Sequence, residues 1–463
     1  MARLTVAEAA NAMGGRITAG DPAGRIEGAA IDSRAIKGGE AFFAFAGAQT
    51  DGHRFVPDAL ARGAGAAIVQ QDVSAPEGAV IRVEDTFKAL HDLARFARTR
   101  VPEKLVGITG SAGKTTTKEL LAAMLASRFR THWTPGNLNN LYGFPMSLLN
   151  APDGAEWMVA EMGMSTPGEL RQLSLLGRPD VAVFTVVRPV HLEFFGTLQA
   201  IAEAKSEILA GLAPDGFIVA NAGDPEVTRI AKRHGARVVW YGMGVENVDV
   251  RARNPAPEPD GAVGSRFTLE AGGGSIEVRL PLHGLYNVEN CLAAAAAAWA
   301  IGLPLEEIAA AVREVKPASM RGVVHRGEAG FLLIDDSYNS NPDAVGKALE
   351  SAAAMPGERR VAVLGDMLEL GPEGPRFHRE SGERAASLGF TVAGVGELSR
   401  ELVEGAKAAG APAVWLPDAA AAADWAAAEA RQGDVVLVKG SRGVGLDRVV
   451  RRLLGSGAGE GAH

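Results

Sequence analysis

The most informative stretch of the sequence is Leu105-Val-Gly-Ile-Thr-Gly-Ser-Ala-Gly-Lys-Thr-Thr-Thr117. An apolar, strand-like run leads into a turn that contains two glycines, and an amphipathic helix pattern follows. Glycine has no Cβ, so backbone N–H groups of the turn can approach an anion, and a helix N-terminus adds its positive dipole end. The pattern predicts a phosphate-binding loop in which Lys114 contacts the β- and γ-phosphates of ATP and Thr115 binds Mg²⁺.

The stretch departs from the strict phosphate-loop pattern at one position. That pattern has a glycine five residues before Gly113, where this sequence has Ile108. Two glycines, a lysine and consecutive threonines still lie between a strand-like run and a helix-like one, which is the context that supports the motif. The alternative is an ordinary strand-to-helix turn with a surface lysine, and this combination of residues disfavours it.

Composition excludes several classes of protein. The chain has 463 residues, a length that predicts about three domains. Its formal net charge of −8 at pH 7 argues against a nucleic-acid partner. The single cysteine, Cys291, excludes a disulfide framework. The N-terminal residues lack the apolar core of a signal peptide, and the longest apolar run, residues 291–305, is too short to span a bilayer. We therefore expect a cytoplasmic protein without membrane insertion.

Strand-like and helix-like runs divide the chain into three segments of α/β type. Residues 1–84 combine short strands and helices, and the turns Asp32-Ser-Arg34 and Asp51-Gly-His53 are either an anion pocket or simple caps. Residues 85–316 alternate strands with helices, which predicts a mostly parallel sheet with ligands at the carboxyl ends of its strands. Residues 317–463 repeat this alternation and predict a second, doubly wound α/β domain.

Polar side chains follow several predicted strands of the middle segment. Glu161 ends the apolar run 157–161, where phosphate-loop enzymes keep a carboxylate for Mg²⁺, although a helix-capping acid would look the same. His191 follows the next strand and is a candidate metal ligand or phosphate contact, although a lone histidine is more often structural. The polar loop 135–140 contains three asparagines and is expected to contact substrate.

Two further groups of polar residues are candidates for ligand binding. Asn287 and Asn290 precede an alanine-rich helical run, where Asn287 is interpreted as a cap and the Asn290 carboxamide matches the hydrogen-bonding edge of adenine. In the last segment, three predicted strands end in the polar runs 335–342, 365–371 and 439–442. Because they follow strands of one sheet, these runs predict a ligand face.

Together these motifs resemble the Mur ligase family, and the resemblance covers nearly the whole chain. It rests on the phosphate loop, on Glu161-Met-Gly163 and His191-Leu-Glu193, and above all on Asp335-Asp-Ser-Tyr-Asn-Ser-Asn-Pro342. The family implies three domains: a small α/β domain for the uridine nucleotide at 1–84, a central phosphate-loop domain with a parallel sheet at 85–316, and a Rossmann-like domain at 317–463. The last would close over ATP and bind the dipeptide.

The resemblance also implies roles for individual residues. Lys114, Glu161, His191 and Lys205 would be catalytic, with Lys205 carried as a carbamate, although its local sequence suggests a surface lysine. Mg²⁺ would contact Thr115, Glu161 and His191. ATP would contact Thr109, Gly110, Ser111, Ala112, Gly113, Lys114, Thr115, Asn287, Asn290, Arg321 and Asp336. The other substrates would contact Ser33, Arg34, Asn139, Asn140, Tyr338, Asn339, Lys439, Ser441 and Arg442.

The activity implied by the resemblance is an ATP-dependent ligation in peptidoglycan synthesis. A monomer would join D-alanyl-D-alanine to UDP-N-acetylmuramoyl-tripeptide through an acyl phosphate, with ATP and Mg²⁺ as cofactors. The alternatives are an amino-acid-adding Mur ligase and folylpolyglutamate synthase, and residues 32–53 speak against the latter. From another class, a nucleotide-switch ATPase would need a base-reading Asn-Lys-x-Asp run or an arginine finger, and the sequence shows neither.

Overall fold

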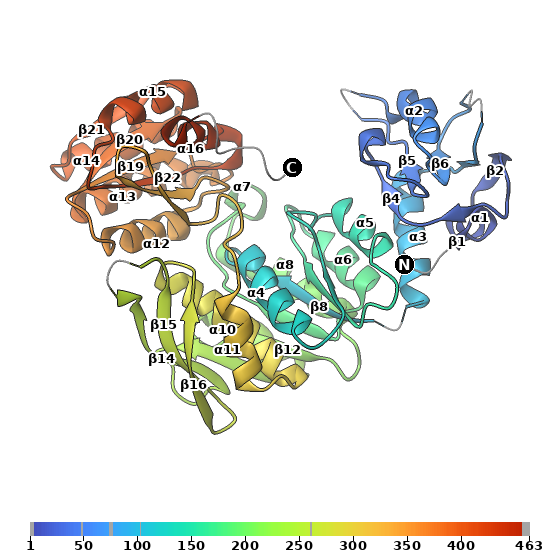
Figure 1. Cartoon of the computed structure of the whole chain (residues 1–463), viewed down its shortest axis with the longest axis horizontal. Coiled ribbons are helices and arrows are strands. Elements are labelled where there is room, and N and C mark those ends of the chain that lie inside the picture. Colours follow the sequence, from blue (N-terminus) through green and yellow to red (C-terminus); the bar gives the residue numbers. More distant parts are fainter. Residues whose placement is uncertain (1–3, 48–49, 74–76, 102, 260–261, 456–463) are drawn as a thin grey trace. The chain divides into compact units, whose positions relative to one another are not determined.

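The computed structural model describes residues 4–47, 50–73, 77–101, 103–259 and 262–455 (Figure 1). Contacts within the chain divide it into two compact units. The first unit consists of Met1–Thr109, Leu125–Val183 and Lys205–Ile218, and the second of Gly110–Met124, Phe184–Ala204 and Val219–His463.

The N-terminal part of the first unit is built on a small sheet. In the described residues it has five strands in the order β2 (Arg16–Ala19), β7 (Val80–Arg82), β6 (Ala66–Val69), β5 (Ala41–Phe43) and β4 (Ala29–Ala30). Strands β4 to β7 are parallel, and β2 is antiparallel to β7. A separate pair joins β1 (Leu4–Thr5) to β3 (Arg25–Ile26), and helices α1 (Val6–Met13) and α2 (Val56–Ala61) complete this part. Its mixture of short strands and helices agrees with the sequence prediction.

The rest of the first unit contains parallel strands and the helices that pack beside them. Strand β8 (Lys104–Thr109) pairs with β10 (Trp157–Glu161), which pairs with β9 (Thr131–Trp133). Leu105, Val106 and Ile108 of β8 are fully buried, so this strand reads as a continuous apolar run in the sequence. Helix α3 (Thr86–Thr99) packs against α1, α5 (Gly143–Leu149) and α6 (Glu169–Gly177). Among the described residues, these strands belong to a nine-stranded sheet with the order β16-β15-β14-β13-β12-β11-β8-β10-β9.

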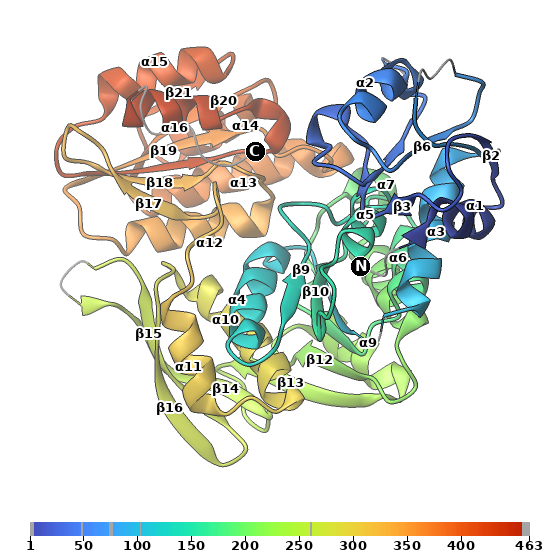
Figure 2. The same cartoon turned by 45° about the vertical axis from the view of Figure 1, so that its right-hand side comes forward.

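An antiparallel meander in the second unit was not expected from the sequence. Strands β14 (Val250–Pro257), β15 (Ser265–Ala271) and β16 (Gly274–Leu280) are antiparallel, while β13 (Arg237–Met243) pairs with β14 in parallel. Helices α10 (Leu285–Ile301) and α11 (Leu305–Arg313) pack against this part of the sheet (Figures 1 and 2). The available signal was the alternation of polar and apolar residues in Arg266-Phe-Thr-Leu-Glu-Ala271, which is typical of a strand with one solvent face.

The remaining elements of the middle of the chain are two further strands of this sheet and the helices between the strands. They are α4 (Lys114–Ala126), β11 (Val181–Phe184), α7 (Leu192–Phe195), α8 (Leu198–Ser206), β12 (Phe217–Asn221) and α9 (Pro225–His234). The predicted strands at 157–161 and 217–221 have the bounds expected from the sequence. The meander lies in the predicted 85–316 segment, whose sheet is therefore mixed.

The C-terminal part of the second unit is the predicted doubly wound domain. In the described residues its sheet has the order β17 (Val323–Arg326), β18 (Leu332–Asp336), β22 (Asp434–Lys439), β19 (Arg359–Gly365), β20 (Phe390–Val395) and β21 (Ala413–Leu416), parallel except for β17. Neighbouring strand residues point into different cores: Leu437 packs under α12 (Pro342–Ala353), α13 (Gly374–Ser387) and α14 (Ser399–Ala408). Val436 packs under α15 (Ala419–Glu429) and α16 (Asp447–Leu454). Both faces are therefore covered, as expected.

Candidate active site

The predicted phosphate loop has two glycines at which a Cβ would collide with a neighbouring side chain. Gly113 has a φ of 83°, and a Cβ there would lie 2.1 Å from Asn290 Oδ1. A Cβ at Gly110 would lie 1.8 Å from Thr185 Oγ1. The loop ends where α4 begins, at Lys114, as the sequence predicted. Bare backbone at the N-terminus of a helix is the arrangement that binds phosphate groups.

The segment after β11 holds this loop in place. Thr185 Oγ1 donates to Ala112 O at 2.6 Å, and Ser111 N donates to Val186 O at 2.7 Å. Ser111 Oγ donates to Arg188 O and accepts from Arg188 N, each at 2.9 Å. Residues 185–188 therefore fix both the backbone and the hydroxyl group of the loop.

Lys114 and Thr115 are the first two residues of α4, directly after the loop. Lys114 Nζ donates to Gly110 O at 2.9 Å, so the ammonium group lies over the loop. Thr115 is 6% exposed at the first turn of α4. A glycine cradle, an overlying cation and a buried hydroxyl fit a nucleoside triphosphate with Mg²⁺.

In the first unit, Glu161 is held by the predicted asparagine loop. Its side chain is buried, and Asn139 Nδ2 donates to Glu161 Oε1 at 2.7 Å. Asn140 has different contacts: its Oδ1 accepts from Tyr142 N and Gly143 N at the start of α5. The structure thus brings Asn139 and Glu161 together, whereas the Asn140 side chain bonds the backbone just before and at the start of α5.

Lys205 is not the surface lysine that its local sequence suggested. It lies near the end of α8 and is 3% exposed. This burial is the feature that its sequence neighbourhood could not show.

His191 contacts a carboxylate that the sequence did not single out. Its Nδ1 pairs with Glu369 Oε2, and Glu193 N donates to Glu369 O at 3.2 Å. Both His191 (φ 55°) and Glu369 (φ 64°) have left-handed backbone conformations, which are strained for residues with a Cβ. Among the described residues, no group of three or more His, Cys, Asp and Glu side chains is arranged to hold a metal ion.

Asn290 reaches the phosphate loop, while Asn287 does not cap its helix. Helix α10 begins at Leu285 after Gly284, so Asn287 lies inside the first turn, and its Nδ2 donates to His283 O at 2.8 Å. The capping interpretation was therefore wrong, because the helix starts earlier than expected. Asn287 Oδ1 instead accepts from Asn290 Nδ2 at 3.2 Å and orients the carboxamide that lies against Gly113.

The three polar runs of the C-terminal domain follow adjacent parallel strands, as predicted. Asp336 on β18 and Lys439 on β22 are register partners, and Lys439 Nζ donates to Asp336 Oδ2 at 2.7 Å and to Asn339 O at 2.9 Å. Lys439 is 3% exposed. In this structure it orients Asp336, which the resemblance assigns to ribose.

Two arginines gather around Tyr338 at the same edge. The Arg321 guanidinium lies 4.0 Å from the Tyr338 ring centroid and that of Arg442 lies 5.9 Å away. Ser441 is buried, and its Oγ accepts from Leu368 N at 3.0 Å. Arg321, Tyr338 and Arg442 thus form one cationic group, whereas Ser441 supports the 365–371 run.

Comparisons with known proteins agree with these motifs. Sequence profiles described as "Mur ligase family, catalytic domain", "Mur ligase middle domain" and "Mur ligase, glutamate ligase domain" match residues 25–98, 108–298 and 320–442. The UDP-N-acetylmuramoyl-tripeptide–D-alanyl-D-alanine ligase of Escherichia coli (strain K12) is 35% identical over 462 residues, covering 99% of this chain and 100% of that protein. The chain belongs to the Mur ligase family.

Solved structures give the same result for the fold of this Mur ligase. A crystal structure of MurF from Acinetobacter baumannii has a TM-score of 0.87 and 31% identity, covering 98% of this chain and 99% of that one. MurF ligase from Thermotoga maritima in complex with ADP has a TM-score of 0.80 and 30% identity, covering 92% and 97%. The chain therefore has the three-domain α/β architecture of the family.

The N-terminal residues expected to contact the uridine nucleotide of a Mur ligase are turn residues. Arg34 is exposed and pairs with Asp32 through Nη2 and Oδ2 at 2.6 Å, and this hydrogen bond lowers the pKa of Asp32. Ser33 is buried beside them. In the neighbouring turn, His53 Nδ1 pairs with Asp51 at 2.6 Å and its Nε2 accepts from Gln70 N at 3.0 Å.

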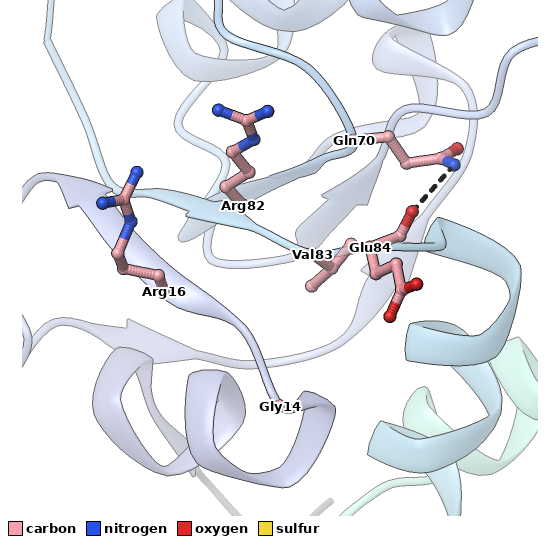
Figure 3. Close-up of a pocket in the computed structure, with 6 residues that line it drawn as sticks. All are labelled: Gly14, Arg16, Gln70, Arg82, Val83 and Glu84. Atoms are coloured by element: carbon pink, nitrogen blue, oxygen red, sulfur yellow. Dashed lines mark hydrogen bonds between the residues drawn. The ribbon is translucent and has the colours of Figure 1, made fainter.

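A pocket of about 430 Å³ lies in the same part of this Mur ligase (Figure 3). Its described lining is Gly14, Arg16, Gln70, Arg82, Val83 and Glu84. Arg16 and Arg82 are cross-strand partners on β2 and β7, and Gln70 Nε2 donates to Glu84 O at 3.3 Å. Neither Ser33 nor Arg34 is among these lining residues, whereas Gln70 also bonds His53 of the second predicted turn through its backbone N–H.

Proposed function

We propose that this Mur ligase joins D-alanyl-D-alanine to UDP-N-acetylmuramoyl-tripeptide in peptidoglycan synthesis, forming an amide bond at the expense of ATP. The observation that carries the proposal is the likeness, over the full length of both chains, to the Escherichia coli enzyme of that name. The phosphate loop and the polar edge of the C-terminal sheet supply the chemical groups that such a reaction needs.

The reaction proceeds in two steps. The terminal carboxylate of the tripeptide attacks the γ-phosphate of ATP, ADP leaves, and an acyl phosphate forms. The amine of D-alanyl-D-alanine then attacks the acyl carbon, phosphate leaves, and the amine loses a proton. Lys114 neutralises charge on the phosphates, and the N-terminus of α4, which begins at Lys114, orients them.

The residues present also fit Mg²⁺, which is bound in phosphate-transfer sites by one or two carboxylates together with phosphate oxygens. The Thr115 hydroxyl and the Glu161 carboxylate would hold it, with Asn139 orienting the carboxylate. When bound, Mg²⁺ neutralises negative charge on the phosphates. His191 is proposed as the further ligand, and its pairing with Glu369 fixes which ring nitrogen remains for that role.

Lys205 is proposed to act as a carbamate, formed when its neutral amine adds to CO2 and releases a proton. The burial of its side chain supports this assignment. A carbamate carries a negative charge, so it would supply an additional carboxylate-like group for Mg²⁺.

The proposal includes the organisation and setting of the protein. Residues 1–84, 85–316 and 317–463 are proposed as its uridine-nucleotide, ATP and dipeptide domains, with the last closing over ATP. Its other proposed features are a monomeric state, a cytoplasmic location and no nucleic-acid partner. The described helices are all too short or too polar to cross a membrane.

The decisive experiment measures ADP release by the purified protein with ATP, Mg²⁺ and the uridine nucleotide-tripeptide. We expect release only when D-alanyl-D-alanine is added, together with a product whose mass has increased by the dipeptide less water. Release with a single amino acid would indicate another Mur ligase, release with folate and glutamate would indicate folylpolyglutamate synthase, and release without any amine would indicate a nucleotide switch.

A further inference from the structure

Arg188 joins three parts of the second unit. Its backbone N–H and C=O both bond Ser111 Oγ of the phosphate loop. Its side chain, 29% exposed, donates from Nη1 to Asp224 Oδ2 at 2.6 Å and from Nε to Asp343 Oδ1 at 3.1 Å. A planar guanidinium can serve two carboxylates in fixed directions, which an ammonium cannot do.

The two carboxylates have different settings. Asp224 is 1% exposed, accepts from Val187 N, and caps α9 through Glu226 N and Val227 N. Asp343 lies in the first turn of α12, directly after the 335–342 run that contains Asp336. The Arg188 guanidinium thus connects Asp224, next to the segment that holds the phosphate loop, to α12, the helix that follows Asp336 in the sequence.

A second ion pair connects the same helix to α10. Lys347 Nζ lies 3.4 Å from Asp343 Oδ2 and 3.4 Å from Glu289 Oε2. Glu289 precedes Asn290, whose carboxamide lies against Gly113. Helix α12 is therefore tied at Asp343 and Lys347 to two elements that contact the phosphate loop.

We propose that Arg188 and Asp343 are positioning residues for ATP in the ligase reaction. Their ion pair fixes α12, and with it Asp336, relative to the phosphate loop. Asp336 can then bind the ribose of the same nucleotide whose phosphates lie in the loop. This inference rests on the proposed function for the identity of the reaction, but its effect on nucleotide binding is measured independently.

The test compares Arg188→Lys, Asp343→Asn and the double variant with the wild type. Arg188→Ala is avoided because it would leave the buried Asp224 without a cation. We expect each single variant to raise KM for ATP and to weaken binding of Mg·ADP, measured by calorimetry, by roughly tenfold, with KM for the other two substrates unchanged. The double variant should be no weaker than either single one, because both changes remove the same ion pair.

Glu350→Gln is the matched control. Glu350 also lies on α12, but it pairs with exposed Arg384 at 2.6 Å, and its removal should leave nucleotide binding unchanged. Additive losses in the double variant, or an unchanged affinity for Mg·ADP in both single variants, would overturn the proposal. A lower kcat with every KM unchanged would also overturn it, since that pattern indicates only a smaller folded fraction. If the wild type binds Mg·ADP but makes no dipeptide product, the proposed function fails while the calorimetric comparison still decides the inference.

Discussion

The Asn290 carboxamide occupies the space that a side chain at Gly113 would need, because its Oδ1 lies only 2.1 Å from the point where a Cβ would stand. Gly113→Ala is therefore expected to displace Asn290 and to abolish tight nucleotide binding. The left-handed φ of 83° adds a strain of about 1–2 kcal/mol. Calorimetric titration with Mg·ADP and thermal unfolding would measure the two effects.

Gly235→Ala is the control that separates the backbone strain of a left-handed φ from the steric clash with Asn290. Gly235 has a φ of 80° at the end of α9, and nothing lies within 4 Å of a Cβ there. This variant should lose a similar amount of stability and keep its nucleotide affinity. Equal affinities in the two variants would show that contact between Gly113 and Asn290 does not matter for binding.

Lys114→Ala is expected to fold normally and to lose activity by roughly 10²- to 10³-fold, the usual cost of removing one group that stabilises charge in the transition state. The Lys114 side chain is only half-buried and its Nζ bonds the loop carbonyl Gly110 O, so its removal should cost little packing energy in the core. Steady-state ADP release and circular dichroism would check both statements. Lys88→Ala is the control, because Lys88 is exposed and pairs with Asp92 on α3. Comparable activity in the two variants would contradict the phosphate-loop assignment.

Lys205→Ala should be inactive and should regain part of its activity when a short carboxylic acid such as formate is added. The acid would refill the place of a carbamate, whereas Lys205→Arg, which cannot form one, leaves no room for such rescue. Initial rates across a series of formate concentrations would show the effect. Full activity of untreated Lys205→Ala would exclude the carbamate.

His378 makes the stability of the C-terminal domain dependent on pH. Its Nε2 accepts from Met367 N at 2.9 Å and its Nδ1 bonds Gly374 O at 2.7 Å, which requires the neutral ring. Burial lowers the pKa of His378 from its usual 6.5. The stability that the neutral ring contributes is therefore fully present above the pKa that His378 has in the unfolded chain. It is lost as the pH falls through the lower pKa that His378 has in the folded protein.

His378→Gln removes that titration. Between about pH 7.5 and about pH 5, the wild type should lose more unfolding free energy than this variant, because only the wild type takes up a proton at this position when it unfolds. Chemical denaturation at a series of pH values would measure the difference. His234→Gln, at an exposed position at the end of α9, serves as the control and should follow the wild type. Parallel curves for wild type and His378→Gln would contradict this account.

Much of the fold could be predicted because its signals are local. The C-terminal domain alternates apolar strands with amphipathic helices, and its strand order places the predicted polar runs after β18, β22 and β19. The β14–β16 meander was missed because strands with one polar face resemble loops when helices are expected between parallel strands. The start of α10 was placed too late because Gly284, which carries no capping side chain, precedes it.

The site was predictable where one motif carries the chemistry, and less so where distant residues meet. Spacing alone was enough to single out Lys114 and Thr115 as candidates. Glu369 could not, because nothing in the 365–371 run distinguishes the residue that contacts His191 from its neighbours. The burial of Lys205 and the pairing of Lys439 with Asp336 likewise depend on packing between segments that are far apart in the sequence.

The bonds from Thr185, Val186 and Arg188 to the phosphate loop have a thermodynamic consequence. Ordering a flexible backbone costs about 1–2 kcal/mol of conformational entropy for each residue. Here hydrogen bonds within the protein supply this ordering for Ser111 and Ala112. Nucleotide binding should therefore cost less conformational entropy than binding to a flexible loop would.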